Sequence, residues 1–384
     1  MRALIFSWIV LVTLMTGLPF AAQAQGFETK ANKVFLVDDE TGSVLFAKGA
    51  DDPVPSASLA KLMVAEIVFE AVAKGELSLD TRFPVSEHAW RTGGAPSGTA
   101  TMFAALKSEI PVADLIKGVT VHFANDACII LAEGMDGGEA AFAARMTAQA
   151  RALGMAGSSF SNATGLPDPG NVVTMRDMVT LARHVHTAHR DLSANFTLAD
   201  FEWNKIRQRN RNPLITANIG VDGFVTGFAE GAGYSMVATM ERDGRRVFLA
   251  VAGLATEKER LEETRKILDW SMANFEPKRL FEAGDTIADA AVYGGAASHV
   301  ALVTKDVVDV LVPVNNPDRL AARVVYRWPL TTPIAPGVSA GVLRILSGDR
   351  LLREVPLETA AAVEQGSLSG RALDALKELL FFWL

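Results

Sequence analysis

Short apolar runs that flank a polar turn containing glycine predict two β-hairpins. Their strands are expected at 34–37 with 44–47, and at 235–240 with 246–252. In the region between the hairpins and after the second one, apolar residues recur at the three- to four-residue spacing of helices with one buried face. These helices are expected at 58–73, 108–117, 139–153, 175–189 and 257–275. Helices inserted between the strands of one sheet predict an α/β (α+β) domain over residues 25–275.

After Pro277 the pattern changes to short strands separated by glycine, proline and asparagine. The strands are expected at 286–292, 300–303, 307–312, 319–327, 341–346 and 350–356. Such a series predicts a second, small all-β domain over residues 276–360. The last segment, 368–384, places apolar side chains at helical spacing opposite charged ones, which predicts an amphipathic helix.

The first residues of the chain have the pattern of a secretory signal peptide. Arg2 precedes an apolar stretch, and Ala22-Gln23-Ala24 is the small-x-small pattern of a cleavage site. An uncleaved membrane anchor is the alternative, but the apolar run is shorter than the roughly 20 residues that a membrane span needs. We therefore expect residues 1–24 to be removed and a mature, exported, periplasmic protein to begin at Gln25.

Composition limits the class of protein and of partner. The 384 residues are 49% apolar and 21% charged, which fits two or three globular domains and excludes a disordered chain. A net charge of −7 without a long basic run argues against nucleic acid as a partner, because binding phosphate needs clustered lysine and arginine. Cys128 is the only cysteine, so no internal disulfide forms and stability must come from core burial.

Ser58 and Lys61 carry the sharpest chemical signal. At positions i and i+3 of a helix their side chains share one face, so the lysine amine can act as a base toward a serine nucleophile. In a first helical turn, free backbone N–H groups and the positive end of the helix dipole favour an oxyanion and help to keep the lysine neutral. The spacing alone arises often by chance, and an N-capping serine beside a solvated lysine is the alternative.

The residues around Ser58 and Lys61 resemble a known sequence motif. Residues 55–63 resemble the active-site signature of the serine D-alanyl-D-alanine carboxypeptidases, the low-molecular-mass penicillin-binding proteins. The resemblance continues in order at 90–94, 124–127, 161–167, 210–212 and 221–227. It implies the penicillin-binding and β-lactamase-like transpeptidase fold, with helices around an antiparallel sheet, followed by a small β domain and an amphipathic anchor helix.

The resemblance also implies roles for single residues. The family serine that matches Ser58 is acylated by the penultimate D-alanine of a peptidoglycan stem peptide, and the lysine that matches Lys61 takes its proton. Hydrolysis of the acyl-enzyme then releases the terminal D-alanine. Asn125 ends a Ser-x-Asn motif in the cleft, and Thr226 and Gly227 match a Lys-Thr-Gly strand that docks the substrate.

The resemblance further implies how the substrate is held. Arg211 would help to hold the terminal carboxylate, and the backbone N–H groups of Ser58 and Phe228 would form the oxyanion hole. Peptidoglycan stem peptides are the expected partners, β-lactams are expected acylating ligands, and neither a cofactor nor a metal is expected.

Two departures from the family pattern fall at the chemistry itself. Phe123 stands where the family has the serine of Ser-x-Asn, and Val225 stands where it has the lysine of Lys-Thr-Gly. The lost serine is a proton conduit, and loss of such a group typically lowers a rate by about 10² to 10⁴. Loss of the neighbouring cation lets Lys61 stay protonated more readily. The two changes replace a polar pair by an apolar pair and narrow the cleft, which motivates the alternative of a pseudoenzyme that binds peptidoglycan without turnover.

Other candidates carry less weight. A β-lactam hydrolase also begins at a Ser-x-x-Lys helix, but the appended β domain argues against it. His122 is interpreted as structural, and Asp126 and Asp222 as capping or loop-fixing residues. The histidines at 184, 186 and 189 are interpreted as a helix face, because no Glu-x-x-His motif or cysteine accompanies the possible pair at 186 and 189. The terminal helix is expected at the outer surface of the inner membrane, with packing on the β domain as the alternative.

Overall fold

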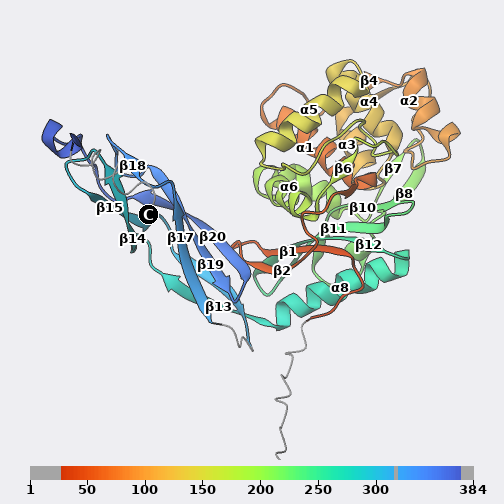
Figure 1. The fold of residues 1–384 in the computed structure, drawn as a ribbon. Coiled ribbons are helices and arrows are strands. Elements are labelled where there is room, and N and C mark those ends of the chain that lie inside the picture. Colours follow the sequence, from red (N-terminus) through yellow and green to blue (C-terminus); the bar gives the residue numbers. More distant parts are fainter. Residues whose placement is uncertain (1–26, 315–318, 373–384) are drawn as a thin grey trace, which may run out of the picture.

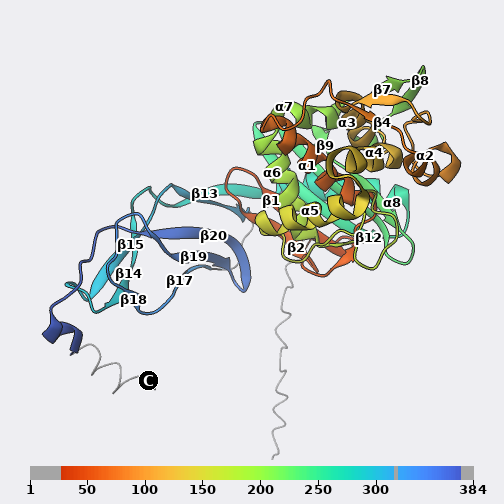
Figure 2. The same ribbon diagram turned by 90° about the horizontal axis from the view of Figure 1, so that it is seen from above.

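The structure, a computed structural model, describes residues 27–314 and 319–372. It has a larger part that contains a sheet between helices and a smaller part built from strands, which lies to one side of the first (Figures 1 and 2). This arrangement confirms the predicted fold class. The predicted signal peptide and nearly all of the predicted terminal helix lie outside the described residues.

A six-stranded antiparallel sheet organises the larger part. Its strands are β1 (Lys33–Asp38), β2 (Val44–Lys48), β9 (Val221–Gly223), β10 (Thr226–Ala229), β11 (Gly233–Arg242) and β12 (Arg245–Leu254). They follow the order β10-β11-β12-β1-β2, and β9 also pairs with β11. Both predicted hairpins are confirmed as β1-β2 and β11-β12.

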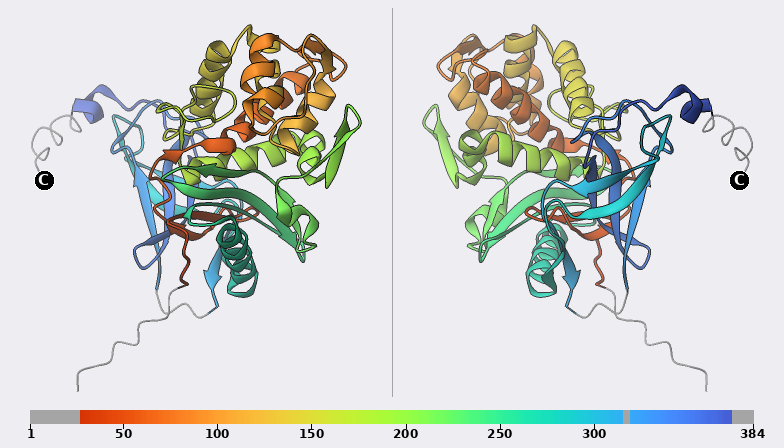
Figure 3. Two further views of the ribbon diagram at one scale, coloured as in Figure 1. Left: turned by 90° about the vertical axis from the view of Figure 1, so that its right-hand side faces the viewer. Right: turned by 90° about the vertical axis from the view of Figure 1, so that its left-hand side faces the viewer.

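Helices cover both faces of this sheet. They are α1 (Ala60–Ala73), α2 (Glu87–Thr92), α3 (Val112–Thr120), α4 (Asn125–Asp136), α5 (Glu139–Ala152), α6 (Met175–Ala188), α7 (Arg190–Ser193) and α8 (Glu257–Ala273). Helix α8 packs on one face, and α6 packs on the other with the remaining helices beyond it (Figure 3). Short 3₁₀ turns lie at η1 (Ala57–Leu59), η2 (Ala95–Ser97), η3 (Ala194–Thr197) and η4 (Pro213–Thr216).

The central strands supply side chains to two separate cores. On β1, Val34 and Leu36 belong to the core beneath α8, whereas Phe35 and Val37 belong to the core that contains α1, α4 and α6. Successive side chains of a strand point to opposite faces, so a strand covered on both sides is apolar throughout. The apolar run at 34–37 therefore reflects a sheet with two buried faces.

Three short antiparallel strand pairs lie outside the main sheet of the larger part. They are β3 (Val54–Pro55) with β6 (Val172–Val173), β4 (Arg82–Pro84) with β5 (Glu109–Pro111), and β7 (Asp200–Trp203) with β8 (Ile206–Arg209). Strand β3 lies directly before the turn that carries Ser58.

The smaller part is all-β and begins where α8 ends. Its strands are β13 (Phe275–Phe281), β14 (Thr286–Tyr293), β15 (His299–Thr304), β16 (Val308–Pro313), β17 (Leu320–Tyr326), β18 (Leu330–Thr331), β19 (Ser339–Ser347) and β20 (Arg350–Thr359). Strand β13 pairs with β16, and the others form a second six-stranded sheet around a core of its own. The Leu311 N–H donates to Ser43 Oγ (3.0 Å), which ties the smaller part to the first hairpin.

The helix predicted at 108–117 is wrong at its start. Residues Glu109–Pro111 form β5, and α3 begins at Val112. A proline disfavours the helical conformation of the residue before it, so the helix cannot extend back through Ile110, and it begins after Pro111, which has extended backbone. The helix predicted at 257–275 ends at Ala273, because Phe275 already pairs in β13.

Among the described residues, no helix combines the length and the apolar character that crossing a bilayer requires.

Candidate active site

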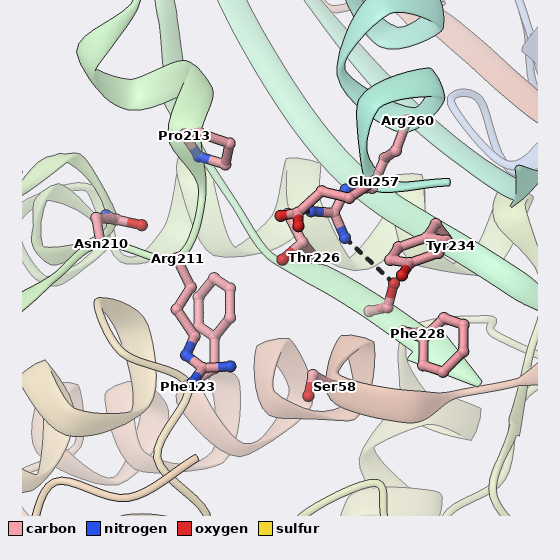
Figure 4. Close-up of a pocket in the computed structure, with 11 residues that line it drawn as sticks. Ser58, Phe123, Asn210, Arg211, Pro213, Thr226, Phe228, Tyr234, Glu257 and Arg260 are labelled. Carbon is pink, nitrogen blue, oxygen red and sulfur yellow. Dashed lines mark hydrogen bonds and ion pairs between the residues drawn. The ribbon is translucent and has the colours of Figure 1, made fainter. Parts of the chain in front are cut away.

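A cleft of about 520 Å³ lies between the start of α1, the edge strand β10 and the first turn of α8. Its lining residues are Ser58, Phe123, Asn210, Arg211, Pro213, Thr226, Gly227, Phe228, Tyr234, Glu257 and Arg260 (Figure 4). Five of the seven site residues predicted from the sequence thus meet in one cavity, although they come from positions 58 to 228 of the chain. The other two, Lys61 and Asn125, lie outside this lining.

Lys61 contacts Ser58 from inside the protein. Ser58 lies in the 3₁₀ turn η1, half-buried, and Lys61 follows in the first turn of α1 with only 1% of its surface exposed. Lys61 Nζ lies 3.2 Å from Ser58 Oγ, as the i, i+3 spacing predicts. Its second partner is the Thr164 carbonyl oxygen, at 2.5 Å. The amine is therefore fixed against the hydroxyl that it would deprotonate.

The surroundings of Lys61 favour a neutral amine. Burial lowers the pKa of Lys61 to about 8; of the two nearby groups that act on it, Cys128 raises the pKa and the Arg211 guanidinium lowers it. The pKa of Lys61 is thus below that of a free amine although Val225, where the sequence analysis expects a family lysine, carries no charge.

The loop 161–167 presses against the turn that holds Ser58. Gly165 has φ +75°, and a Cβ atom there would lie 1.8 Å from the Ala57 carbonyl oxygen. Asn162 Oδ1 accepts hydrogen bonds from the backbone N–H groups of Thr164 (3.2 Å) and Gly165 (2.8 Å), which closes the loop. The loop thereby presents the Thr164 carbonyl to Lys61, a contact that the sequence analysis did not assign.

Gly227 allows β10 to approach the same turn. A Cβ atom at this position would lie 2.7 Å from Ser235 Oγ and 3.3 Å from the Ala57 Cβ. Next to it, Thr226 is buried at the base of the cleft, and the Phe228 ring is 56% exposed and packs against Tyr234. Strand β10 therefore forms one wall of the cavity, opposite Ser58 and Arg211 (Figure 4).

Asn125 lies at the start of α4, behind the cleft. Its side-chain N–H donates to Thr99 Oγ1 (3.0 Å), while its buried Oδ1 has no hydrogen-bond partner among the described residues. The neighbouring Asp126 carboxylate accepts hydrogen bonds from Thr101 Oγ1 (2.5 Å) and from the Met102 N–H (2.9 Å). The interpretation of Asp126 as a loop-fixing residue is confirmed.

Asp222 and His122 both make structural contacts. Asp222 makes a two-point ion pair with Arg246, at 2.9 and 2.7 Å; its role is structural, but it joins strands β9 and β12 and does not fix a loop. The His122 ring lies against the backbone of β8, with Nδ1 3.2 Å from the Arg209 carbonyl oxygen, which is a structural contact.

Comparison with known proteins identifies the family of this chain. Residues 19–256 match the family model of D-alanyl-D-alanine carboxypeptidase, and residues 275–365 match that of the penicillin-binding protein 5 C-terminal domain. The chain is 32% identical to the D-alanyl-D-alanine carboxypeptidase DacC of Escherichia coli strain K12, over 91% of this chain and 88% of that one. The chain belongs to the D-alanyl-D-alanine carboxypeptidase family. It is therefore a serine-type hydrolase by family.

Solved structures resemble this carboxypeptidase over most of its length. Penicillin-binding protein 5 from Haemophilus influenzae has a TM-score of 0.73 and 30% identity, covering 88% of this chain and 99% of that one. Penicillin-binding protein D2 from Listeria monocytogenes, in its ampicillin-bound form, has a TM-score of 0.55 and 30% identity, covering 64% and 98%. Binding of β-lactams fits the family.

Phe123 and Val225, where the sequence analysis expects departures from the family pattern, lie in the apolar core of the carboxypeptidase. Phe123 is 2% exposed and lines the cleft, whereas Val225 is fully buried and is not among the lining residues. Both belong to the larger core cluster of this part of the protein. Phe123 also has φ +54°, a conformation that is strained for a bulky side chain.

Arg260 is a cleft residue that the sequence analysis missed. It lies in the first turn of α8, is 4% exposed, and pairs with Glu257 at 2.9 Å. Its Nη1 lies 3.4 Å from the Gly227 carbonyl oxygen, and its buried Nε has no hydrogen-bond partner among the described residues. Arg260 and Arg211 thus bring two guanidinium groups to one cavity.

The pKa of Lys61 predicts how acylation of the carboxypeptidase depends on pH. The neutral fraction of an amine with a pKa of about 8 rises about tenfold between pH 7 and pH 9, and only the neutral amine can accept the Ser58 proton. The rate of adduct formation with penicillin, followed by mass spectrometry, is expected to rise by the same factor. A flat profile, or a midpoint near the 10.5 of a free lysine, would contradict this assignment.

Replacing Phe123 by serine is expected to raise the acylation rate by about 10- to 100-fold, because a positioned hydroxyl restores a proton conduit. The matched control is Phe123→Ala, which opens the cleft equally without adding a hydroxyl. The measurement is again the rate of penicillin adduct formation. Equal rates in the two variants would show that the ring restricts access and that proton transfer is not limiting.

Proposed function

We propose that this carboxypeptidase is catalytically competent and removes the terminal D-alanine of peptidoglycan stem peptides through an acyl-enzyme on Ser58. The observation that carries the proposal is the buried Lys61 amine, 3.2 Å from the Ser58 hydroxyl, at a cleft of about 520 Å³. Cavities of roughly 300 to 1,000 Å³ are typical of small-molecule sites. The loss of polar groups at Phe123 and Val225 leaves this pair and its cavity in place.

Acylation begins with transfer of the Ser58 hydroxyl proton to the neutral Lys61 amine. The Ser58 oxygen then bonds to the carbonyl carbon of the penultimate D-alanine, and negative charge develops on the carbonyl oxygen. The backbone N–H groups of Ser58 and Phe228 are the donors that we assign to this oxyanion. Phe228 lies on β10 and lines the same cleft as Ser58, which supports the assignment.

The leaving amine must gain a proton as its bond to carbon breaks. Phe123 offers no hydroxyl for this transfer, so we assign the donor role to the Lys61 ammonium, which holds the proton taken from Ser58. The Thr164 carbonyl keeps Nζ in place while the proton is held. Water then hydrolyses the ester of Ser58, which releases the shortened peptide and restores the hydroxyl.

Arg211 and Arg260 are the groups that we assign to the terminal carboxylate of the substrate. Paired guanidinium donors match the geometry of a carboxylate better than a single lysine does. Both line the cleft, Arg211 from the segment just before η4 and Arg260 from the first turn of α8 (Figure 4). We therefore assign the scissile bond to the space between these two arginines and Ser58.

The test is release of D-alanine from a synthetic stem-peptide mimic that ends in D-alanyl-D-alanine. Wild-type protein is expected to turn over many equivalents. Binding to purified sacculi with no D-alanine released would contradict competence and favour the peptidoglycan-binding pseudoenzyme, the alternative that Phe123 and Val225 motivate.

We also propose that the protein is exported to the periplasm after removal of residues 1–24. The support is the small-x-small pattern at Ala22-Gln23-Ala24 behind an apolar stretch. N-terminal sequencing of the protein from a periplasmic extract is expected to begin at Gln25.

The C-terminal helix is proposed to lie on the membrane surface. Its charged residues nearly cancel, so binding would come from burial of apolar side chains such as Leu379, Phe382 and Trp383. Full-length protein is expected to sediment with neutral liposomes, and a chain that ends at residue 366 is expected to stay in the supernatant. Equal sedimentation of the two chains would contradict the proposal.

A further inference from the structure

A buried carboxylate on the catalytic helix lies between two histidine rings. Glu66 is on α1, five residues after Lys61, and is fully buried. His184 Nε2 lies 3.0 Å from Glu66 Oε1, and His189 Nε2 lies 3.2 Å from Glu66 Oε2. Both histidines come from α6 and its C-terminal end. The three side chains therefore join α1 to α6 at a point away from the substrate cleft, whose lining includes none of them.

The three groups are arranged to share a ligand. One donor atom from each lies within 4.8 Å of the other two. Glu66 Oε2 and both ring nitrogens of His189 are buried and have no hydrogen-bond partner among the described residues. The 3.2 Å approach of His189 to Glu66 thus lacks the alignment of a hydrogen bond, although buried polar atoms normally have a partner.

Surrounding residues hold these side chains in place. Gln149 of α5 donates to Glu66 Oε1 at 3.0 Å and so orients the carboxylate. The backbone of His189 is fixed on both sides, since its N–H donates to Val185 (3.1 Å) and its carbonyl accepts from Ser193 (2.8 Å). Its ring packs edge-on against Phe69. The Gln149 hydrogen bond is an outer contact of the kind that orients metal ligands.

We propose that Glu66, His184 and His189 form a Zn²⁺ site. Two imidazoles and one carboxylate are a donor set that zinc takes with a fourth position left for water. His184 is 35% exposed, which gives an ion and that water a route from solvent. Imidazole nitrogen favours zinc and its neighbours in the transition series over magnesium or calcium. The ion would clamp α1, the helix that positions Ser58 and Lys61, onto α6.

This site differs from the histidine pair considered in the sequence analysis. His186 points elsewhere and packs against Phe248, with ring centroids 5.7 Å apart. The carboxylate ligand, Glu66, lies more than one hundred residues earlier in the chain, so no local sequence motif indicates it. His186 is therefore a matched control, because it lies on the same helix as His184 but outside the cluster.

The test is a zinc titration of the full chain, purified without a histidine tag and treated with chelator beforehand. Isothermal titration calorimetry is expected to show one equivalent bound to wild type and to His186→Ala. The variants His184→Ala and Glu66→Gln are expected to bind at least about 100-fold more weakly, since each removes a direct ligand. Zinc is expected to raise the melting temperature of the first two proteins only, and Co²⁺ to give the visible absorption of a low-coordinate site.

Three results would overturn the proposal. They are no stoichiometric zinc binding to wild type, binding by His184→Ala equal to that of wild type, or loss of binding in His186→Ala. His184 is partly exposed, so its alanine variant is the one best suited to retain the fold. Formation of the penicillin adduct by chelated His184→Ala reports on folding independently of metal.

Discussion

Replacing Ser58 by alanine is expected to abolish the covalent adduct that the wild-type protein forms with penicillin. The Ser58 hydroxyl lies 3.2 Å from the buried Lys61 amine, within hydrogen-bond distance of its base. Removal of a catalytic serine lowers acyl-transfer rates by roughly 10⁶-fold. Intact-mass measurement after incubation with penicillin is expected to show one adduct per wild-type chain and none on Ser58→Ala.

The exposed Ser78 provides the control for this experiment. Ser78→Ala makes the same substitution at an exposed serine beyond the end of α1. This variant is expected to be acylated at the wild-type rate. An adduct that persists on Ser58→Ala would mean that another group is the nucleophile. If wild type itself stays unmodified at high penicillin concentration and long times, the non-catalytic scaffold becomes the better description and sacculus binding is the next measurement.

Replacing Gly165 by alanine is expected to lower the free energy of unfolding by about 3 kcal/mol, and the acylation rate by more than tenfold. The new Cβ atom would lie 1.8 Å from the Ala57 carbonyl oxygen, which is backbone and cannot rotate away. The loop must then move from the catalytic turn and take with it the Thr164 carbonyl that holds Lys61. Urea unfolding and the rate of penicillin adduct formation measure the two effects.

Gly75→Ala is the control that separates the effect of this steric contact from the cost of a left-handed backbone conformation. Gly75 has a φ of +73°, nearly equal to the +75° of Gly165, but nothing lies within 4 Å of a Cβ atom at position 75. Gly75→Ala is therefore expected to lose only about 1 kcal/mol, the cost of a left-handed residue, and to acylate normally. Equal losses in the two variants would remove the steric explanation for Gly165.

Local patterns in the sequence predicted the parts of the fold that depend on neighbouring residues. The two hairpins were predictable because turn and strand signals are adjacent. The contact of Ser58 with Lys61 was predictable because a helical turn fixes it. Helix α4 was not predicted: all eight residues from Asn125 to Ala132 are buried, so the polar face that reveals most helices is absent.

Tertiary contacts account for what the sequence analysis missed at the site. Arg260 reaches the cleft only because α8 packs on β11 and β12, about two hundred residues after Ser58. The partner of Lys61 in the loop 161–167 is a backbone carbonyl, which every residue has and no motif can identify. Glu66 and His189 likewise meet only through the packing of α1 against α6.

Burial of the Lys61 amine lowers the stability of the folded chain. Because its pKa is about 8 in the folded chain and 10.5 in a free lysine, the unfolded chain binds the proton more tightly. The fold is therefore penalised below about pH 8, and the penalty is relieved as pH rises toward 10.5. An apolar residue at position 61 would avoid this penalty, so stability alone does not account for a buried lysine there. The burial of Lys61 is better explained by its contact with the Ser58 hydroxyl than by the stability of the core.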